Sequence, residues 1–157
     1  MNNHYTTQSE IERVVNDFET CRTGKECFHH AQHLVIATVY LETLSLQAAV
    51  SKMRSALHRF LDHHAIGKQK YNETLTVFWL EMVARVLREL PEEKSLVEKC
   101  NRTIEKLSNP GLALEFYSEG LLWSQQARES FVEPDLKHWD DSAADNANKH
   151  RSKSSRE

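Results

Sequence analysis

Apolar residues recur at spacings of three and four along most of this chain, which is the period of an amphipathic α-helix. The pattern predicts five successive helices before position 108. The first is expected to follow an N-cap at Ser9 and to end near 20–23. The next three are expected at about 26–43, 45–64 and 71–90, and the fifth from Glu92 or Ser95 to about 107.

The C-terminal third has a different pattern. Residues 112–136 are richer in aromatic side chains and are interrupted by Gly120 and Pro134, so we expect two short helices, one capped by Ser124, and an extended exit. After Trp139 no large apolar residue occurs, and such a segment cannot offset its ordering entropy. The pattern therefore predicts an all-α fold: a single-domain bundle of five to six helices over 8–139, with a disordered polar tail over 140–157.

The most informative stretch is FHHAQHLVIATVYL, residues 28–41. A helix that is apolar around most of its circumference is normally buried in the middle of a domain. Its first turn nevertheless carries histidines, and polar groups that face a core need partners. His30 and His33 lie on the row that continues through Ala37 and Leu41, whereas His29 is more peripheral. We therefore expect His30 and His33 to form a buried pair.

The predicted fourth helix contains a matching polar position. Glu73 falls on the same stripe as Val77, Leu80 and Ala84, so its carboxylate points towards the core. A buried carboxylate is costly unless it meets a cation or several donors. We expect the two histidines of the neighbouring helix to supply these contacts, directly or through a metal. Trp79, on the same helix, is a candidate wall of a ligand pocket.

Spacing alone leaves three interpretations of His30, His33 and Glu73 open. The three side chains could ligate a divalent metal (iron, zinc or manganese), since two histidines and a carboxylate form open zinc sites and facial iron sites. They could instead be the catalytic groups of a metal-free acid–base pocket. They could also form a hydrogen-bonded cluster that only fixes helix packing. The zinc-protease signature is excluded, because it needs Glu where this chain has His30.

Composition narrows the class of protein. Twenty Lys and Arg against 23 Asp and Glu give a net charge of −3, with no basic excess to indicate nucleic acid as the main partner. The longest apolar run is far shorter than the roughly 20 residues of a membrane helix. The N-terminal residues do not form a signal peptide, and three cysteines without a CxxC pair are typical of a reducing compartment. We therefore expect a cytoplasmic protein without a membrane partner.

Three strings of the sequence resemble the motifs of a family of small uncharacterised bacterial all-α proteins. The chain has FHHAQHL for F-x-H-x-x-H-[LV], YNETLT for Y-[HN]-E-T-[IL]-T, and FVEPDL for F-V-x-P-D-L, in the same order. The resemblance covers about residues 18–136 and implies no reaction, because the family has no established activity. It places His30 and His33 on the family histidines. The further motif positions that would line or orient the pocket are Tyr71, Thr76 and Arg128.

Two functions follow from these observations. The first is a small-molecule enzyme or binding protein that uses His30, His33 and Glu73. The alternative is a non-enzymatic helical module that binds another protein through an exposed apolar patch on 116–123. A cavity open to solvent beside the histidines would favour the first, and a dry, closed hydrogen-bonded cluster the second. Whether the chain forms a homo-oligomer is left open.

Overall fold

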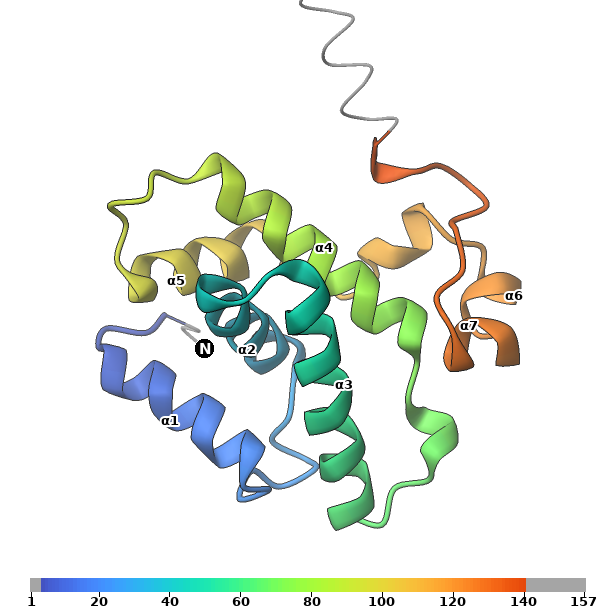
Figure 1. Ribbon diagram of the computed structural model, residues 1–157, viewed down its shortest axis with the longest axis horizontal. Coiled ribbons are helices and arrows are strands. Elements are labelled where there is room, and N and C mark those ends of the chain that lie inside the picture. Colours follow the sequence, from blue (N-terminus) through green and yellow to red (C-terminus); the bar gives the residue numbers. More distant parts are fainter. Residues whose placement is uncertain (1–3, 141–157) are drawn as a thin grey trace, which may run out of the picture.

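The computed structural model describes residues 4–140, and every regular element among them is helical (Figure 1). The predicted all-α, single-domain fold is confirmed, with seven α-helices in this range rather than five to six. The α-helices are α1 (Gln8–Glu19), α2 (His30–Thr43), α3 (Leu46–His63), α4 (Glu73–Glu89), α5 (Leu96–Lys106), α6 (Glu119–Leu122) and α7 (Gln125–Glu129). Two 3₁₀ turns, η1 (Lys68–Lys70) and η2 (Leu112–Glu115), join them. The predicted tail lies, beyond its first residue, outside the described range.

Side-chain caps set the start of most helices. Ser45, Ser95 and Ser124 each accept a hydrogen bond from the backbone N–H three residues on. The predicted cap at Ser124 is confirmed, and Ser45 and Ser95 are residues at which helices were expected to start. The predicted cap of the first helix is wrong. Thr7, not Ser9, is the N-cap, because Thr7 and Glu10 satisfy each other's backbone N–H groups in a capping box.

The start of α2 also differs from the prediction. The helix begins at His30 rather than near position 26, with His29 as the N-cap residue and its N–H donating to Gln32 Oε1 at 3.0 Å. Phe28, which extends the apolar run, packs from the preceding loop. Its ring stacks on Phe18, with centroids 4.8 Å apart. The apolar character of Phe28 therefore reflects loop packing, and the histidines lie at the very start of the helix.

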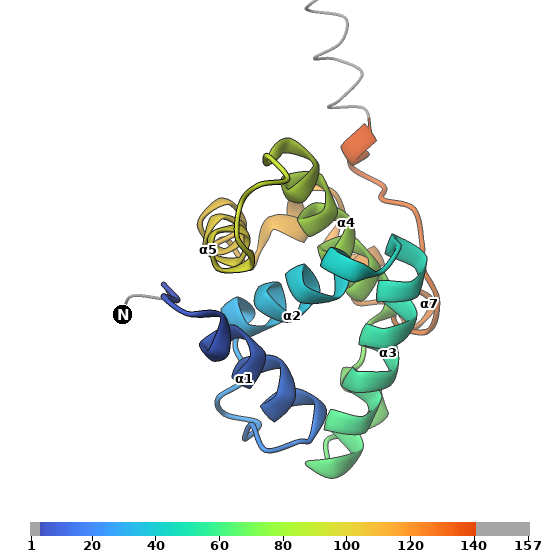
Figure 2. The ribbon, with the colours of Figure 1, turned by 60° about the vertical axis from the view of Figure 1, so that its left-hand side comes forward.

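The helices α2 and α4 form the centre of the molecule. Helix α2 contacts α1, α3, α4 and α5, and α4 contacts α2, α3, α5 and α7. In Figure 1, α1 and α5 lie on one side of α4, and α6 and α7 lie on the other. Figure 2 shows α2 passing between α1 and α4. The apolar run of α2 forms the middle of the core, with Leu34, Val35, Ile36, Ala37 and Tyr40 all buried.

Hydrogen bonds fasten the C-terminal segment to the start of α4. Asn72 Nδ2 donates to the carbonyl of Leu122 at 2.8 Å, and Thr74 Oγ1 donates to the carbonyl of Ala127 at 2.7 Å. Both side chains are buried, so these bonds form away from competing water. They hold α6 and α7 against the first turn of α4 and so bring Arg128 beside Glu73 and Tyr71 in one pocket wall.

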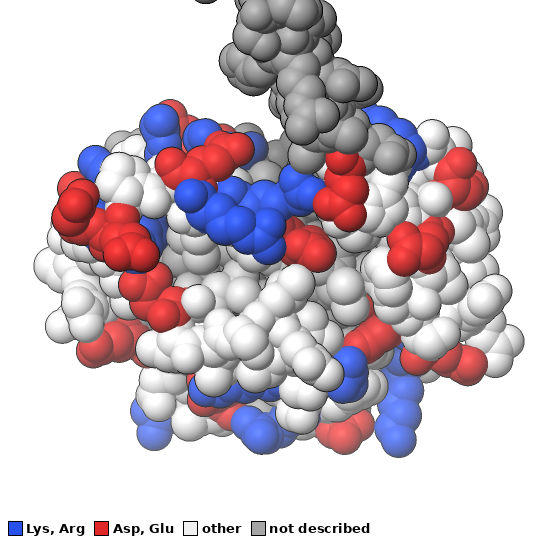
Figure 3. All heavy atoms as spheres, turned by 45° about the horizontal axis from the view of Figure 1, so that its top comes forward, with Lys and Arg blue, Asp and Glu red and all other residues white. Residues whose placement is uncertain are grey.

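The surface carries both signs of charge. On the face in Figure 3, a small group of basic side chains is flanked by acidic ones. Of the helices in residues 4–140, none combines the length and the apolar character needed to cross a membrane.

Candidate functional site

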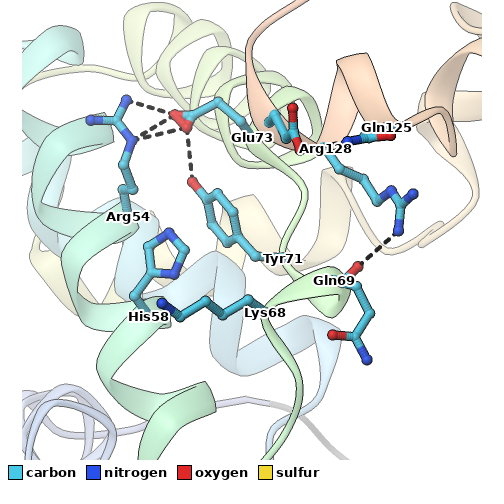
Figure 4. Close-up of a pocket in the computed structure, with 9 residues that line it drawn as sticks. Arg54, His58, Lys68, Gln69, Tyr71, Glu73, Gln125 and Arg128 are labelled. Carbon is cyan, nitrogen blue, oxygen red and sulfur yellow. Dashed lines mark hydrogen bonds and ion pairs between the residues drawn. The ribbon is translucent and has the colours of Figure 1, made fainter.

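Glu73 is the first residue of α4 and is only 6% exposed, as the hydrophobic stripe predicts. Its carboxylate is held by Arg54 of α3, whose Nε lies 2.8 Å from Oε1 and 2.9 Å from Oε2, while Nη2 lies 2.6 Å from Oε1. The hydroxyl of Tyr71 donates to Oε2 at 2.9 Å. Figure 4 shows both contacts converging on the carboxylate. A cation and a hydroxyl donor therefore compensate the burial of Glu73.

The predicted partners of Glu73 were wrong. Its cation comes from Arg54, because α3 packs beside α4 and its arginine reaches the carboxylate from a position that is 44% exposed. His30 and His33 instead line a different pocket, whose wall does not include Glu73. Within residues 4–140, no three or more His, Cys, Asp or Glu side chains are grouped so that they could hold a metal ion. The expected metal triad is therefore not assembled.

The pocket that contains the histidines has a volume of about 340 Å³, and we call it the histidine pocket. It lies between the start of α2, the second half of α3 and the first turns of α4. Aromatic and aliphatic side chains form most of its wall, and the predicted residues Tyr71, Thr76 and Trp79 belong to it. The full lining is Phe28, His29, His30, His33, Leu57, Phe60, Leu61, Lys70, Tyr71, Asn72, Leu75, Thr76 and Trp79.

His30 has one of its two ring nitrogens engaged. Its Nε2 lies 2.7 Å from the backbone carbonyl of Leu107, just after α5. A carbonyl oxygen can only accept, so Nε2 carries the hydrogen and Nδ1 of the neutral ring is an acceptor. The imidazole also meets the ring of Trp79 edge-on, with centroids 4.5 Å apart. This contact orients His30 in the pocket wall.

His33 is a second imidazole that the histidine pocket presents. Burial, and secondarily the nearby His30, lower its pKa to about 4, so the ring is neutral at neutral pH. Its ring packs against Phe28 at 4.6 Å and makes no hydrogen bond within residues 4–140. In that range Arg85 Nε is the one fully buried side-chain nitrogen or oxygen atom without a partner. His33 is half-buried and lines the pocket, so a bound molecule could reach its ring nitrogens.

A second pocket, of about 480 Å³, lies on the other side of Tyr71, and we call it the arginine pocket. Burial raises the pKa of Tyr71 to about 12, so its hydroxyl stays protonated and can donate to Glu73. The His58 ring lies 4.3 Å from the Tyr71 ring. The lining residues are Arg54, His58, Lys68, Gln69, Tyr71, Glu73, Gln125, Arg128 and Glu129 (Figure 4).

The predicted site residues are thus divided between two neighbouring pockets. His30, His33, Thr76 and Trp79 line the histidine pocket, Glu73 and Arg128 line the arginine pocket, and Tyr71 lines both. Sequence reasoning missed six polar residues of the arginine pocket, and three of these are basic. Two of them, Arg54 and His58, are four residues apart on α3 and therefore share a face, which is a detectable signal. The third, Lys68, follows Gly67 in a turn and carries no such pattern.

Comparison of the chain with protein-family models, curated proteins and solved structures finds no match in any of the three. The resemblance of its motifs to the bacterial family therefore stays a prediction.

Proposed function

We propose that the protein binds a small molecule in the histidine pocket. One observation supports this most directly: His33 is neutral, makes no hydrogen bond within residues 4–140 and faces a pocket of about 340 Å³. A polar group without an internal partner is expected to bond with water or a ligand. If the two histidines only fixed the packing of the helices, both rings would be expected to form hydrogen bonds within the protein. His30 does so with the carbonyl of Leu107.

The lining indicates the chemistry of the ligand. Phe28, Phe60 and Trp79 give the pocket an aromatic wall, and ligand sites are commonly apolar with a few placed polar groups. His33 and His30 offer a donor and acceptor nitrogens, and both can act without carrying charge. We infer an uncharged ring compound with one or two hydrogen-bonding groups. An enzymatic version would use His30 Nδ1 as the proton acceptor, since the pKa of His33, at about 4, makes it a weak base.

The location proposed is the cytoplasm. The support is that Cys21, Cys27 and Cys100 are all free thiols, with Cys21 and Cys100 buried. The net charge of −3 agrees with a small-molecule partner rather than nucleic acid.

A titration with benzamide, a neutral ring compound with an amide group, tests the proposal. We expect saturable changes in the NMR signals of His33 and Trp79. His33→Leu keeps an apolar side chain in the wall but removes both nitrogens, and should weaken benzamide binding about tenfold, the value of one hydrogen bond. The matched control is His63→Leu on exposed α3 surface, which should bind as wild type does. Binding that is unchanged in His33→Leu, or absent from wild type, would contradict the proposal.

The alternative function, a module that binds another protein, has one observation in its favour. The large apolar residues Leu114, Trp123, Phe131 and Leu136 are exposed, and all lie in the C-terminal part of the described chain. It is nevertheless the weaker candidate. In the 116–123 stretch where the patch was expected, Phe116, Tyr117 and Leu122 are buried, and Trp123 is the large apolar residue that is exposed.

A further inference from the structure

We propose that the arginine pocket is a second binding site, which takes a small organic anion with a carboxylate or phosphate group. The pocket presents more positive charge than its own carboxylates compensate. Its wall contains three permanent cations, Arg54, Lys68 and Arg128, and two carboxylates, Glu73 and Glu129.

The carboxylates do not neutralise the cations evenly. Glu73 is taken up by Arg54 through Nε and Nη2, which leaves Arg54 Nη1 without a hydrogen bond in the described chain. Glu129 accepts from Gln125 Nε2 at 2.9 Å and pairs with neither of the other cations. Within residues 4–140, Lys68 and Arg128 form no ion pair. Both line the pocket, so their charges are available to an anion that binds there.

Arg128 is held in place without being neutralised. Its Nη1 donates to the carbonyl of Gln69 at 3.3 Å and its Nε to the carbonyl of Ser124 at 3.4 Å. Carbonyl oxygens fix the orientation of a guanidinium but leave its full charge, and its remaining N–H groups match the two oxygens of a carboxylate or phosphate. In Figure 4, Arg54 meets Glu73 at one side of the pocket, and the Arg128 side chain extends towards Gln69 on the other side. The two arginines belong to different elements, α3 and α7, and both line the pocket.

The rest of the lining favours an organic anion over a bare inorganic ion. The volume of about 480 Å³ exceeds that of a single phosphate, and the adjacent rings of Tyr71 and His58 offer an apolar surface beside the cations. His58 adds positive charge when it is protonated. This proposal does not depend on ligand binding in the histidine pocket, since the two linings share only Tyr71.

The probes are sodium benzoate and phenyl phosphate, each titrated into the protein. A titration with sodium chloride at the same ionic strength is the control. Benzoate matches benzamide in shape but carries a charge, so the pair separates the two pockets. We expect benzoate and phenyl phosphate to shift the NMR signals of Arg128 Nε and His58 saturably, and benzamide to leave them unchanged. The anion that binds more tightly shows whether the pocket prefers a carboxylate or a phosphate group. Shifts that chloride reproduces, or benzoate shifts at His33 instead of Arg128, would overturn the proposal.

The variants test whether the named cations carry the binding. Lys68→Gln with Arg128→Gln should weaken benzoate binding at least about tenfold, since charge-assisted bonds are the strong ones. Arg22→Gln with Lys25→Gln removes the same charge from exposed positions outside both pockets and should change little. Because Arg128 also ties α7 to η1, Lys68→Gln alone is a second test, on an exposed side chain. An effect no larger than that of the control pair would overturn the proposal.

Discussion

Arg54 and Glu73 form a two-pronged ion pair between α3 and α4, in which the Glu73 side chain is 8% exposed and the Arg54 side chain 44% exposed. The pair closes one side of the arginine pocket, and the Tyr71 hydroxyl completes the shell of the carboxylate. Glu73 also lies in the first turn of α4, where a negative charge interacts favourably with the helix dipole. The carboxylate is therefore an anchor that fixes α3 against α4 and orients Arg54.

Removal of Arg54 should cost more stability than removal of the whole pair. Arg54→Gln leaves Tyr71 as the remaining partner of the buried Glu73 carboxylate. We expect the free energy of unfolding to fall by about 2 kcal/mol. This loss is smaller than that for a fully buried pair, because Arg54 is half exposed. The double variant with Glu73→Gln should recover part of this loss, because no uncompensated charge remains. Urea unfolding of the single and double variants measures both values.

Arg102 provides the control for this experiment. It pairs with Glu105 at 3.3 Å on the exposed surface of α5, and Arg102→Gln should change stability by less than about 0.5 kcal/mol. If Arg54→Gln were equally mild, the Arg54–Glu73 pair would be an ordinary surface contact and not an anchor.

Replacement of Asn72 by Asp is expected to destabilise the protein. Its side-chain oxygen caps α4 by accepting from the N–H of Leu75 at 3.0 Å, and its Nδ2 donates to the carbonyl of Leu122. Asn72→Asp keeps the cap but places a buried carboxylate oxygen against that carbonyl. We expect a loss of about 2 kcal/mol, measured by thermal unfolding. The control is Ser95→Asp at the exposed N-cap of α5, whose stability should be close to that of wild type. Equal stability of both variants would show that the Leu122 contact contributes little.

Much of the helical fold follows from the sequence because local signals specify it. Ser45, Ser95 and Ser124 mark helix starts that the structure reproduces, since a serine cap acts within four residues of itself. The failure at α2 has the opposite origin. Phe28 continues the apolar pattern, but it packs on Phe18 from a loop, and periodicity cannot separate a helical apolar residue from a packed loop residue.

The candidate site was harder to predict for a related reason. The stripe of α4 identifies Glu73 as buried, but it carries no information on which neighbouring helix supplies the cation. Arg54 lies beside the apolar face of α3 and looks like a surface residue in the sequence, because its long side chain reaches the carboxylate from an exposed position. The crossing of α3 and α4 decides the pairing, and that crossing is a tertiary property.

His30 should contribute to stability through its bond to α5. Its Nε2–H donates to the carbonyl of Leu107, the residue that ends that helix. His30→Leu removes the donor and should lower the free energy of unfolding by about 1 kcal/mol. Thermal unfolding measures the change, with the exposed His63→Leu as the comparison. If His30→Leu were as stable as wild type, the carbonyl of Leu107 would be as well satisfied by water as by the imidazole.

The lowered pKa of His33 makes stability depend on pH in a defined window. The unfolded chain protonates His33 near its ordinary pKa of 6.5, whereas the folded protein does so at about 4. Above pH 6.5 the ring is neutral in both states, so the stability is fully present. Between pH 6.5 and 4 only the unfolded state gains the proton, and the free energy of unfolding falls by up to about 3 kcal/mol. Below pH 4 this contribution falls no further.

His33→Leu should flatten that dependence, whatever its effect on stability at neutral pH. Urea unfolding at half-unit steps from pH 7.5 to 4 gives the slope for each protein, and the difference between the two slopes reports the contribution of His33. His63→Leu, at an exposed position, should retain the wild-type slope. If the His33→Leu slope matched wild type, His33 would titrate normally in the folded protein. It would then be charged at mildly acidic pH, and the neutral imidazole on which the proposed ligand pocket depends would be lost there.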